Sequence, residues 1–328
     1  MRRRTLFTLI AGAAAWPRSA NAQQPKRPVI GFLSNPSREV LTELLLLSAF
    51  HRGLADTRYV EGKNVAIEYR FADGQVDRIP ALAADLVNQN VDVLAAFTNP
   101  TALAAKAATR TIPIVFIIGG DPVKLGLVDS LNRPLGNATG ISFFSTQLEA
   151  KRLGLLHELV PRATLIAVLT NPNQPAASAQ EEEAATAARA LGLKVQVVHA
   201  TNEAEIDTAF SNCVQIGAGG LLVTADALFF SRYKEIIALA ARHAIPTIYE
   251  WRHIAVAGGL ASYGSSLADA LHQAGVYAGE IIAGDAKVTD LPVVQTTKFE
   301  FVINLRTAKS LDIEVPPMLS ARADHIIE

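Results

Sequence analysis

The sequence predicts an α/β protein with two like lobes of parallel sheet around a cleft. At 328 residues the chain is long enough for two domains with full cores. Strand-length apolar runs alternate with helical patterns across short loops, which favours parallel sheets covered by helices on both faces. The alternation starts again near the middle of the chain, and one motif recurs in both halves.

The recurring motif is an apolar run that ends in a small hydroxyl residue, Asn and Pro. It occurs at 94–100 (LAAFTNP), at 166–172 (IAVLTNP) and, in shorter form, at 32–36 (FLSNP). Each copy predicts a buried strand that passes into a helix, because Ser, Thr and Asn cap helices and Pro fits the first helical turn. Free N–H groups at a helix N-terminus suit an anion, and such strand ends line the ligand crevice of open α/β sheets. Capping alone explains any single copy as well as a site does, whereas three copies favour a site.

In the first half, strands and helices alternate. The helical segment at 39–55 has a broad apolar face at helical spacing, and the segment at 64–69 alternates apolar and polar residues as a half-buried strand does. The expected strands are 29–33, 64–69, 91–97, 112–118 and 139–143, and the expected helices are 39–55, 79–88 and 101–109.

The second half repeats the pattern from a helix at 147–159 onward, and its first strand leads into the second Thr-Asn-Pro. The further strands expected are 165–169, 195–198, 220–223, 246–249, 258–264, 293–294 and 299–304. The further helices expected are 176–191, 203–216, 231–243, 268–283 and 306–311.

The composition excludes several classes of partner. Half of the residues are hydrophobic, 19% are charged and the net charge is −1, so no basic face for nucleic acid is expected. The histidines are scattered without HxxxH or CxxC spacing, so no metal and no cofactor are expected. Cys213 is the only cysteine and lies in an apolar helical pattern, which predicts a buried, inert thiol.

The N-terminus predicts a secretory signal peptide at 1–22. Three arginines at 2–4 precede a short apolar run at 6–16, and Ala-Asn-Ala at 20–22 predicts cleavage after Ala22. The consecutive arginines resemble a twin-arginine signal, with the general secretory route as the alternative. No other stretch has spanning length without charges. The mature chain is therefore expected to be exported and soluble, without stable membrane insertion.

Polar residues at the carboxyl ends of the predicted strands are the candidate ligand contacts. Hydroxyls and amides at helix N-termini hold a carboxylate, Asp121 or Asp226 pairs with an ammonium, and tyrosines stack on the ligand body. Plainer roles compete, because Asp121 precedes Pro122 as in many turns and Tyr249 fits a core edge, whereas Asp226 ends an otherwise apolar strand. The candidates are Ser34, Asn35, Thr98, Asn99, Asp121 and Ser142 in the first half and Asn171, Asp226, Tyr249 and Tyr263 in the second.

Catalytic motifs are missing from the sequence. It contains no GxSxG, HExxH or GxxxxGK[ST] pattern and no GxGxxG between a strand and a helix. His243 and His253 flank Tyr249 near the predicted cleft, but the sequence pairs neither with an acid. A binding cleft is therefore favoured over an enzyme, and an exported α/β enzyme with an unrecognised cleft site remains the alternative.

Several segments form a recognisable set. They are 29–34 (VIGFLS), 103–109 (LAAKAAT), 112–116 (IPIVF), 258–264 (GGLASYG) and the tail at 301–311 (FVINLRTAKSL) with 316–317 (PP) and 321–324 (ARAD). Together they resemble the ABC transporter substrate-binding proteins whose better-known members take aromatic amino acids, and the resemblance runs over nearly all of the mature chain. One departure is that the family's Asp-Pro-Phe-Phe appears here as DALFF at 226–230, which keeps the acid and adds a residue.

The resemblance implies a type I periplasmic binding protein with two hinge-linked Rossmann-like lobes. It places the three crossings at 143–146, 262–266 and 286–291, with lobe 1 at 27–143 plus 264–288 and lobe 2 at 144–263 plus 289–328. It also implies a periplasmic monomer that traps a small polar solute, with an amino acid as the lead, and delivers it to ABC permease subunits. A ligand-sensing module for a membrane receptor is the other alternative, since it differs only in its partner.

Overall fold

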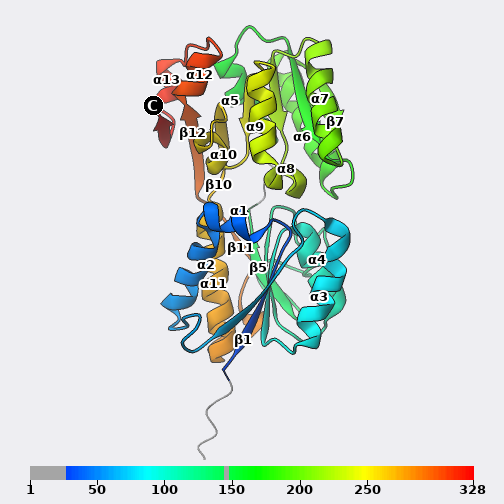
Figure 1. Ribbon diagram of the computed structural model, residues 1–328, viewed down its shortest axis with the longest axis vertical. Coiled ribbons are helices and arrows are strands. Elements are labelled where there is room, and N and C mark those ends of the chain that lie inside the picture. Colours follow the sequence, from blue (N-terminus) through cyan, green and yellow to red (C-terminus); the bar gives the residue numbers. More distant parts are fainter. Residues whose placement is uncertain (1–26, 144–147) are drawn as a thin grey trace, which may run out of the picture.

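The structure is a computed structural model that describes residues 27–143 and 148–328. The predicted signal peptide, its cleavage after Ala22, the crossing at 144–146 and the first residue of the helix expected at 147–159 lie outside the described residues. The chain forms two lobes, one above the other in Figure 1, and each lobe is a sheet between helices. This confirms the predicted α/β fold class with parallel-dominated sheets. In the described ranges, no helix combines the length and the apolarity that a membrane crossing needs.

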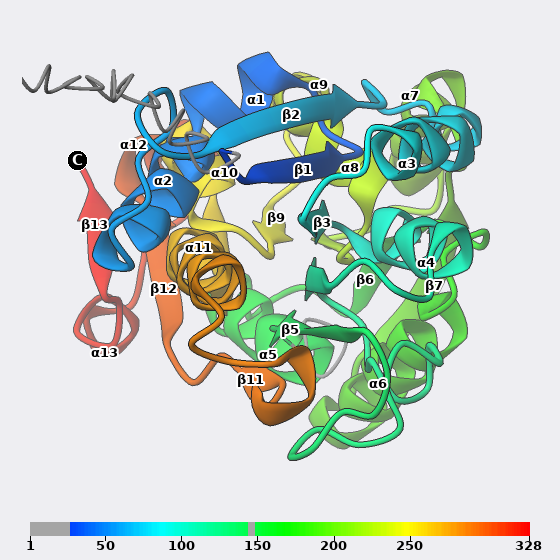
Figure 2. The ribbon, with the colours of Figure 1, turned by 90° about the horizontal axis from the view of Figure 1, so that it is seen from below.

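The first lobe is built on a sheet of order β11-β5-β4-β3-β1-β2, and all its strand pairs are parallel. Every residue of β3 and β4 is buried, since helices cover both faces of the sheet. The strands are β1 (Val29–Ser34), β2 (Ala66–Phe71), β3 (Val93–Phe97), β4 (Ile114–Ile118), β5 (Ala138–Ser142) and β11 (Val294–Gln295). Helices α2 (Leu46–Asp56) and α11 (Leu267–Ala283) cover one face, and α3 (Ile79–Asn88) and α4 (Asn99–Ala108) cover the other (Figure 2).

The helix predicted at 39–55 is interrupted. The structure has α1 (Arg38–Glu43) and then α2, with Leu45 between them in the left-handed region at φ 57°. No Gly or Pro announces the break, and Leu45 is 64% exposed, so its side chain is not held in the core. The prediction of one continuous helix is therefore wrong, and the break lets α1 take its own direction at the boundary between the lobes (Figure 1).

The second lobe is built on a sheet of order β13-β12-β10-β9-β8-β6-β7, in which only the β10–β12 pair is antiparallel. Its strands are β6 (Leu165–Thr170), β7 (Lys194–His199), β8 (Gly220–Val223), β9 (Thr247–Tyr249), β10 (Ala261–Ser265), β12 (Phe299–Asn304) and β13 (His325–Ile327). Helices α5 (Glu149–Leu159) and α6 (Ala177–Leu191) pack on one face, and α7 (Glu203–Gln215), α9 (Tyr233–Arg242) and α10 (Arg252–Val256) on the other.

Short elements complete the fold, and the sequence patterns did not predict most of them because they span too few residues to show a period. They are the helices α8 (Ala227–Ser231), α12 (Leu305–Ser310) and α13 (Pro317–Ser320) and the 3-10 turns η1 (Val76–Arg78) and η3 (Val288–Asp290). Of these, only α12 matches an expected helix, at 306–311. The tail strand β13 pairs in parallel with β12, so the C-terminus ends on the outer edge of the second sheet.

Strand pairing moves two of the predicted lobe boundaries. β10 pairs with β12 as far as Ser265, so the second lobe extends beyond 263. β11 pairs with β5, Val294 lying opposite Ile141, so the first lobe extends beyond 288 and the chain returns to the second lobe only after Gln295. The two-residue strand β11 has too short a sequence to reveal which sheet it joins.

The crossings between the lobes lie side by side and are joined by hydrogen bonds. Ser265 Oγ donates to the carbonyl of Phe143 at 3.1 Å, and the N–H of Ser266 donates to the carbonyl of Lys298 at 3.3 Å. The N–H of Thr296 donates to the carbonyl of Ser142 at 3.1 Å. Hydrogen bonds therefore hold the described parts of the connections together at the boundary between the lobes.

Candidate functional site

A cavity of about 280 Å³ lies between the two lobes, at the carboxyl ends of β3, β6, β8 and β9. It has roughly twice the 150 Å³ that an engineered cavity offers to benzene, so it has room for a small aromatic solute with polar groups. The first lobe contributes Gly74, Val76, Phe97, Thr98, Asn99, Pro100, Gly119 and Phe143. The second contributes Asn171, Asn173, Gln174, Pro175, Thr201, Ala225, Asp226, Ala227, Leu228, Phe230, Glu250 and Trp251.

The first-lobe wall contains the N-terminus of α4. Thr98 is the N-cap residue and has φ 107° and ψ 157°, a region that only Gly adopts without strain. Its carbonyl accepts from Thr101 Oγ1 at 2.9 Å and from the N–H of Ala102 at 3.1 Å, which holds this conformation. Asn99 Oδ1 accepts from the N–H of Gly120 at 3.2 Å. The first turn of a ten-residue helix therefore borders the cavity, where its partial positive charge favours an anionic group.

The second-lobe wall contains Asp226, the N-cap residue of α8. Its Oδ1 accepts from the N–H of Leu228 at 2.8 Å and from Asn171 Nδ2 at 3.2 Å. Burial raises the pKa of Asp226, and these hydrogen bonds oppose the rise. The carbonyl of the preceding Ala225 accepts from Gln174 Nε2 at 3.2 Å and from Gln180 Nε2 at 3.1 Å. Hydrogen bonds to the carbonyl of Ala225 and to the carboxylate of Asp226 therefore hold the segment before α8 in place.

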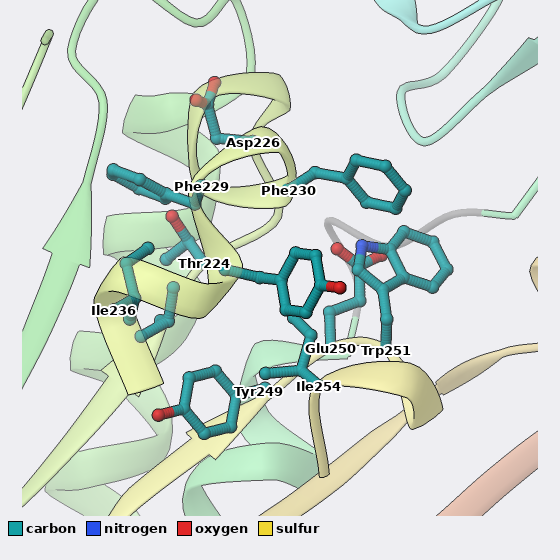
Figure 3. A pocket seen from close by; sticks show the side chains of 11 residues that line it. Thr224, Asp226, Phe229, Phe230, Ile236, Tyr249, Glu250, Trp251 and Ile254 are labelled. Atoms are coloured by element: carbon teal, nitrogen blue, oxygen red, sulfur yellow. The ribbon is translucent and has the colours of Figure 1, made fainter. Parts of the chain in front are cut away.

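Aromatic side chains from both lobes meet at the cavity. Phe97 contacts Phe230 at 5.9 Å between ring centroids, Phe143 contacts Trp251 at 5.1 Å, and Phe230 and Trp251 lie 6.5 Å apart. Figure 3 shows the rings of Phe230 and Trp251 near each other, with Glu250 beside Trp251. The sequence does not single out these rings as ligand contacts, because they stand in or beside apolar runs that are typical of a buried core. Trp251 lies two residues beyond the end of β9, and that position is the signal which could have indicated it.

The charges of the lining are one-sided. In the described ranges the cavity is lined by two acidic residues, Asp226 and Glu250, and by no Lys, Arg or His. Such a lining favours a ligand with a cationic group, because a buried carboxylate is stabilised by an opposite charge.

The predicted contacts divide into two groups. Thr98 and Asn99 lie on one wall of the cavity, and Asn171 and Asp226 lie on the opposite wall. The remaining candidates lie outside the lining. In the first lobe, Ser34 Oγ donates to the carbonyl of Pro36 at 2.9 Å, and Asn35 is fully buried beside it.

Two further first-lobe candidates form hydrogen bonds with backbone groups of the loop that follows β4. Ser142 Oγ donates to the carbonyl of Gly120 at 2.9 Å. Asp121 accepts from the N–H groups of Val123 and Lys124 at 2.9 and 3.2 Å, as its position before a Pro suggested.

The two tyrosines also lie outside the cavity. Tyr249 is 1% exposed, and its hydroxyl points away from Trp251 in Figure 3. It borders a smaller cavity of about 10 Å³, the space of a single water, behind Phe230. Tyr263 on β10 stacks on Phe299 of β12, with 6.0 Å between the ring centroids.

The three copies of the recurring motif have different outcomes. The copy at 94–100 passes straight into α4. After the copy at 32–36, Ser37 is the residue that caps α1. After the copy at 166–172, turns intervene and α6 begins only at Ala177. The prediction that each copy passes into a helix is therefore confirmed, since α1, α4 and α6 begin within two residues of the starts expected at 39, 101 and 176. Only the copy at 94–100 places its Pro in the first helical turn, because Pro is also compatible with a turn.

Comparison with known proteins identifies the class. Residues 28–327 match the family described as ABC transporter substrate binding protein, so the chain belongs to this family and the resemblance read from the sequence is confirmed. A curated relative, the tyrosine-binding protein of Clostridioides difficile (strain R20291), is 30% identical over 266 residues, which are 81% of this chain and 76% of that protein.

Solved structures agree with this assignment. A conserved domain protein from Vibrio cholerae is 27% identical, with a TM-score of 0.84 over 92% of this chain and 100% of its own. A structure from Streptococcus pneumonia in complex with L-Trp is 24% identical, with a TM-score of 0.82 over the same shares, and shows the same fold. A ligand-free, open substrate-binding protein from Clostridium difficile is 25% identical, with a TM-score of 0.65 over 92% of this chain and 99% of its own.

Proposed function

We propose that this protein is the solute-binding component of an ABC importer and traps an amino acid between its lobes. One observation carries the proposal: the cavity between the lobes has a carboxylate, Asp226, on one wall and the N-terminus of α4 on the other. An ammonium group pairs with Asp226, and a carboxylate lies against the first turn of α4. The name of the tyrosine-binding relative supports an amino acid as the solute.

In this proposal the four polar residues of the two walls, Thr98, Asn99, Asn171 and Asp226, contact the ligand. The rings of Phe97, Phe230 and Trp251 enclose its apolar part. Because the walls belong to different lobes, both contact the solute only when the lobes are closed. The solute's higher affinity for the closed arrangement then drives closure. The TM-score is 0.65 against the open, ligand-free structure and 0.84 against the Vibrio cholerae protein. This difference supports a closed arrangement of the present chain, since two like lobes at another angle superpose less well.

The sequence supports the cellular context of the proposal. The N-terminal pattern at 1–22 directs export, and the mature chain then acts as a monomer in the periplasm and docks on permease subunits after closure. Lobe 1 comprises 27–143 and 266–295, and lobe 2 comprises 148–265 and 299–328, following the strand pairing.

A thermal-shift screen of the purified mature chain against amino acids and other small polar solutes tests the proposal. A solute at a hundredfold excess over its Kd stabilises the folded state by about 2.7 kcal/mol, so a specific solute raises the melting temperature by several degrees. Amino acids are expected among the solutes that do so. The proposal fails if no solute shifts melting while the chain chemically converts one of them.

A further inference from the structure

Glu43, the last residue of α1, bonds two residues of the opposite lobe outside the cavity. Its Oε2 accepts from Lys234 Nζ at 2.7 Å, and its Oε1 accepts from the Tyr233 hydroxyl at 3.3 Å. The hydrogen bond to Lys234 lowers the pKa of Glu43 and raises the pKa of Lys234. None of these three residues lines the cavity between the lobes. The contact therefore joins the lobes without touching the space where the solute lies.

A chain of packed rings connects this contact to the cavity wall. Phe230, which lines the cavity, contacts the ring of His253 at 5.1 Å, and His253 contacts Tyr233 at 5.0 Å. Burial lowers the pKa of His253 to about 3, so this imidazole is uncharged at neutral pH and acts as a packing group. Because Phe230 also contacts Phe97 of the first lobe, the cavity wall and the Glu43 contact form at the same lobe angle.

The break after α1 places Glu43 where it can make this contact. Leu45, at φ 57°, separates α1 from α2, so the two segments do not form one helix. In Figure 1, α1 lies at the lobe boundary below the second lobe. A helix continuous over 39–55 would keep one direction throughout and would not have this separate segment. The strained, exposed Leu45 has no other evident role in the packing.

We propose that Glu43 is a positioning residue that stabilises the closed arrangement and thereby raises the affinity for the solute without touching it. The part that concerns affinity rests on the proposed function, whereas the effect on closure does not. A solute that binds the closed form has an apparent Kd equal to its intrinsic Kd divided by the closed fraction. For an exposed ion pair, such as this one with side chains 50% and 64% exposed, the expected effect is roughly two- to fivefold.

Small-angle X-ray scattering of the ligand-free mature chain tests closure directly. Glu43→Gln and Lys234→Gln should each increase the radius of gyration, and the charge-exchanged double variant Glu43→Lys/Lys234→Glu should restore it. High salt should increase it in the wild type, because the pair is screened, and should have little effect in Glu43→Gln. The matched control is Glu203→Gln, since Glu203 bonds Arg232 at 2.7 Å within the second lobe and is similarly exposed.

Calorimetric titration with L-tyrosine tests the affinity. Glu43→Gln should weaken binding roughly two- to fivefold, the exchanged pair should recover it, and Glu203→Gln should leave it unchanged. The proposal is overturned if Glu43→Gln leaves the radius of gyration unchanged, or if the exchanged pair restores neither measurement. If the wild type does not bind L-tyrosine, the titration uses the amino acid that raises the melting temperature in the thermal-shift screen. If no amino acid does so, that result counts against the proposed function, and the scattering experiment still decides the role of Glu43.

Discussion

Asp226 offers the sharpest test of how the cavity recognises its solute. Its carboxylate has two separable tasks: it caps α8 through the N–H of Leu228, and in the proposal it pairs with the ammonium of the solute. Asn and Asp are equally good N-cap residues, so Asp226→Asn keeps the cap and the bond from Asn171 while it removes the charge. The variant should therefore fold with nearly unchanged stability and bind its solute more weakly.

The size of the loss follows from the kind of bond that is removed. A hydrogen bond to a charged partner contributes about 1.5–3 kcal/mol, which corresponds to a Kd that rises about 10- to 150-fold. Because burial raises the pKa of Asp226, wild-type affinity should also fall as the pH is lowered and this carboxyl takes up its proton. That pH dependence should disappear in Asp226→Asn.

The assay is calorimetric titration with L-tyrosine and with tyramine, which keeps the ammonium and lacks the carboxylate. Asp121→Asn is the matched control, since Asp121 caps a turn outside the cavity in the other lobe. Asp226→Asn should weaken both ligands and Asp121→Asn neither. If Asp226→Asn binds L-tyrosine as tightly as the wild type does, Asp226 does not recognise the ammonium and the reasoning is refuted.

Three further predictions concern stability. Gly275→Ala should destabilise the first lobe by about 1–3 kcal/mol, because its Cβ would lie 2.2 Å from the carbonyl oxygen of Phe50, where α11 packs on α2. The control Gly154→Ala, on α5, should instead stabilise the fold by about 0.5–1 kcal/mol, because no atom lies within 4 Å of the added Cβ. Equal changes of the two variants in the free energy of urea unfolding would contradict the packing argument. Thr98→Gly should raise the free energy of unfolding by about 1 kcal/mol, since Gly adopts φ 107° without strain, and a clear loss of stability would show that the strain is absent. Burial raises the pKa of Glu149 to about 7 from 4.5, so between these pH values the folded chain retains a proton that the unfolded chain releases. The melting temperature should therefore fall as the pH rises through this window. If the melting temperature of Glu149→Gln depends on pH as steeply as that of the wild type, another group causes the fall.

The parts of the fold that follow from periodicity could be predicted, and the parts that depend on tertiary contacts could not. The helix α3 and the strand β8 have the bounds that the sequence pattern predicted, because apolar residues at helical spacing mark α3 and a short apolar run marks β8. The break at Leu45 leaves no mark in the sequence, since Leu is a good helix former and no Gly or Pro stands at the break. The lobe assignment of β11 likewise depends on its pairing with β5.

The candidate site shows the same division. Thr98 follows the fully buried strand β3 directly and Asp226 lies three residues beyond the end of β8, so the rule that ligands lie at strand ends indicates them. The rule alone also selects Tyr249, which ends β9 but turns into the core because side chains alternate along a strand. Trp251 reaches the cavity from beyond the strand, a position that only the course of the loop determines.

Native mass spectrometry of the mature chain, after incubation with a mixture of amino acids, tests the central claim most directly. We expect one non-covalent 1:1 adduct whose mass equals that of an unmodified amino acid, and we expect it to be lost in Asp226→Asn. No adduct with any amino acid, or the appearance of a converted amino acid in solution, would contradict a protein that binds and releases its solute unchanged.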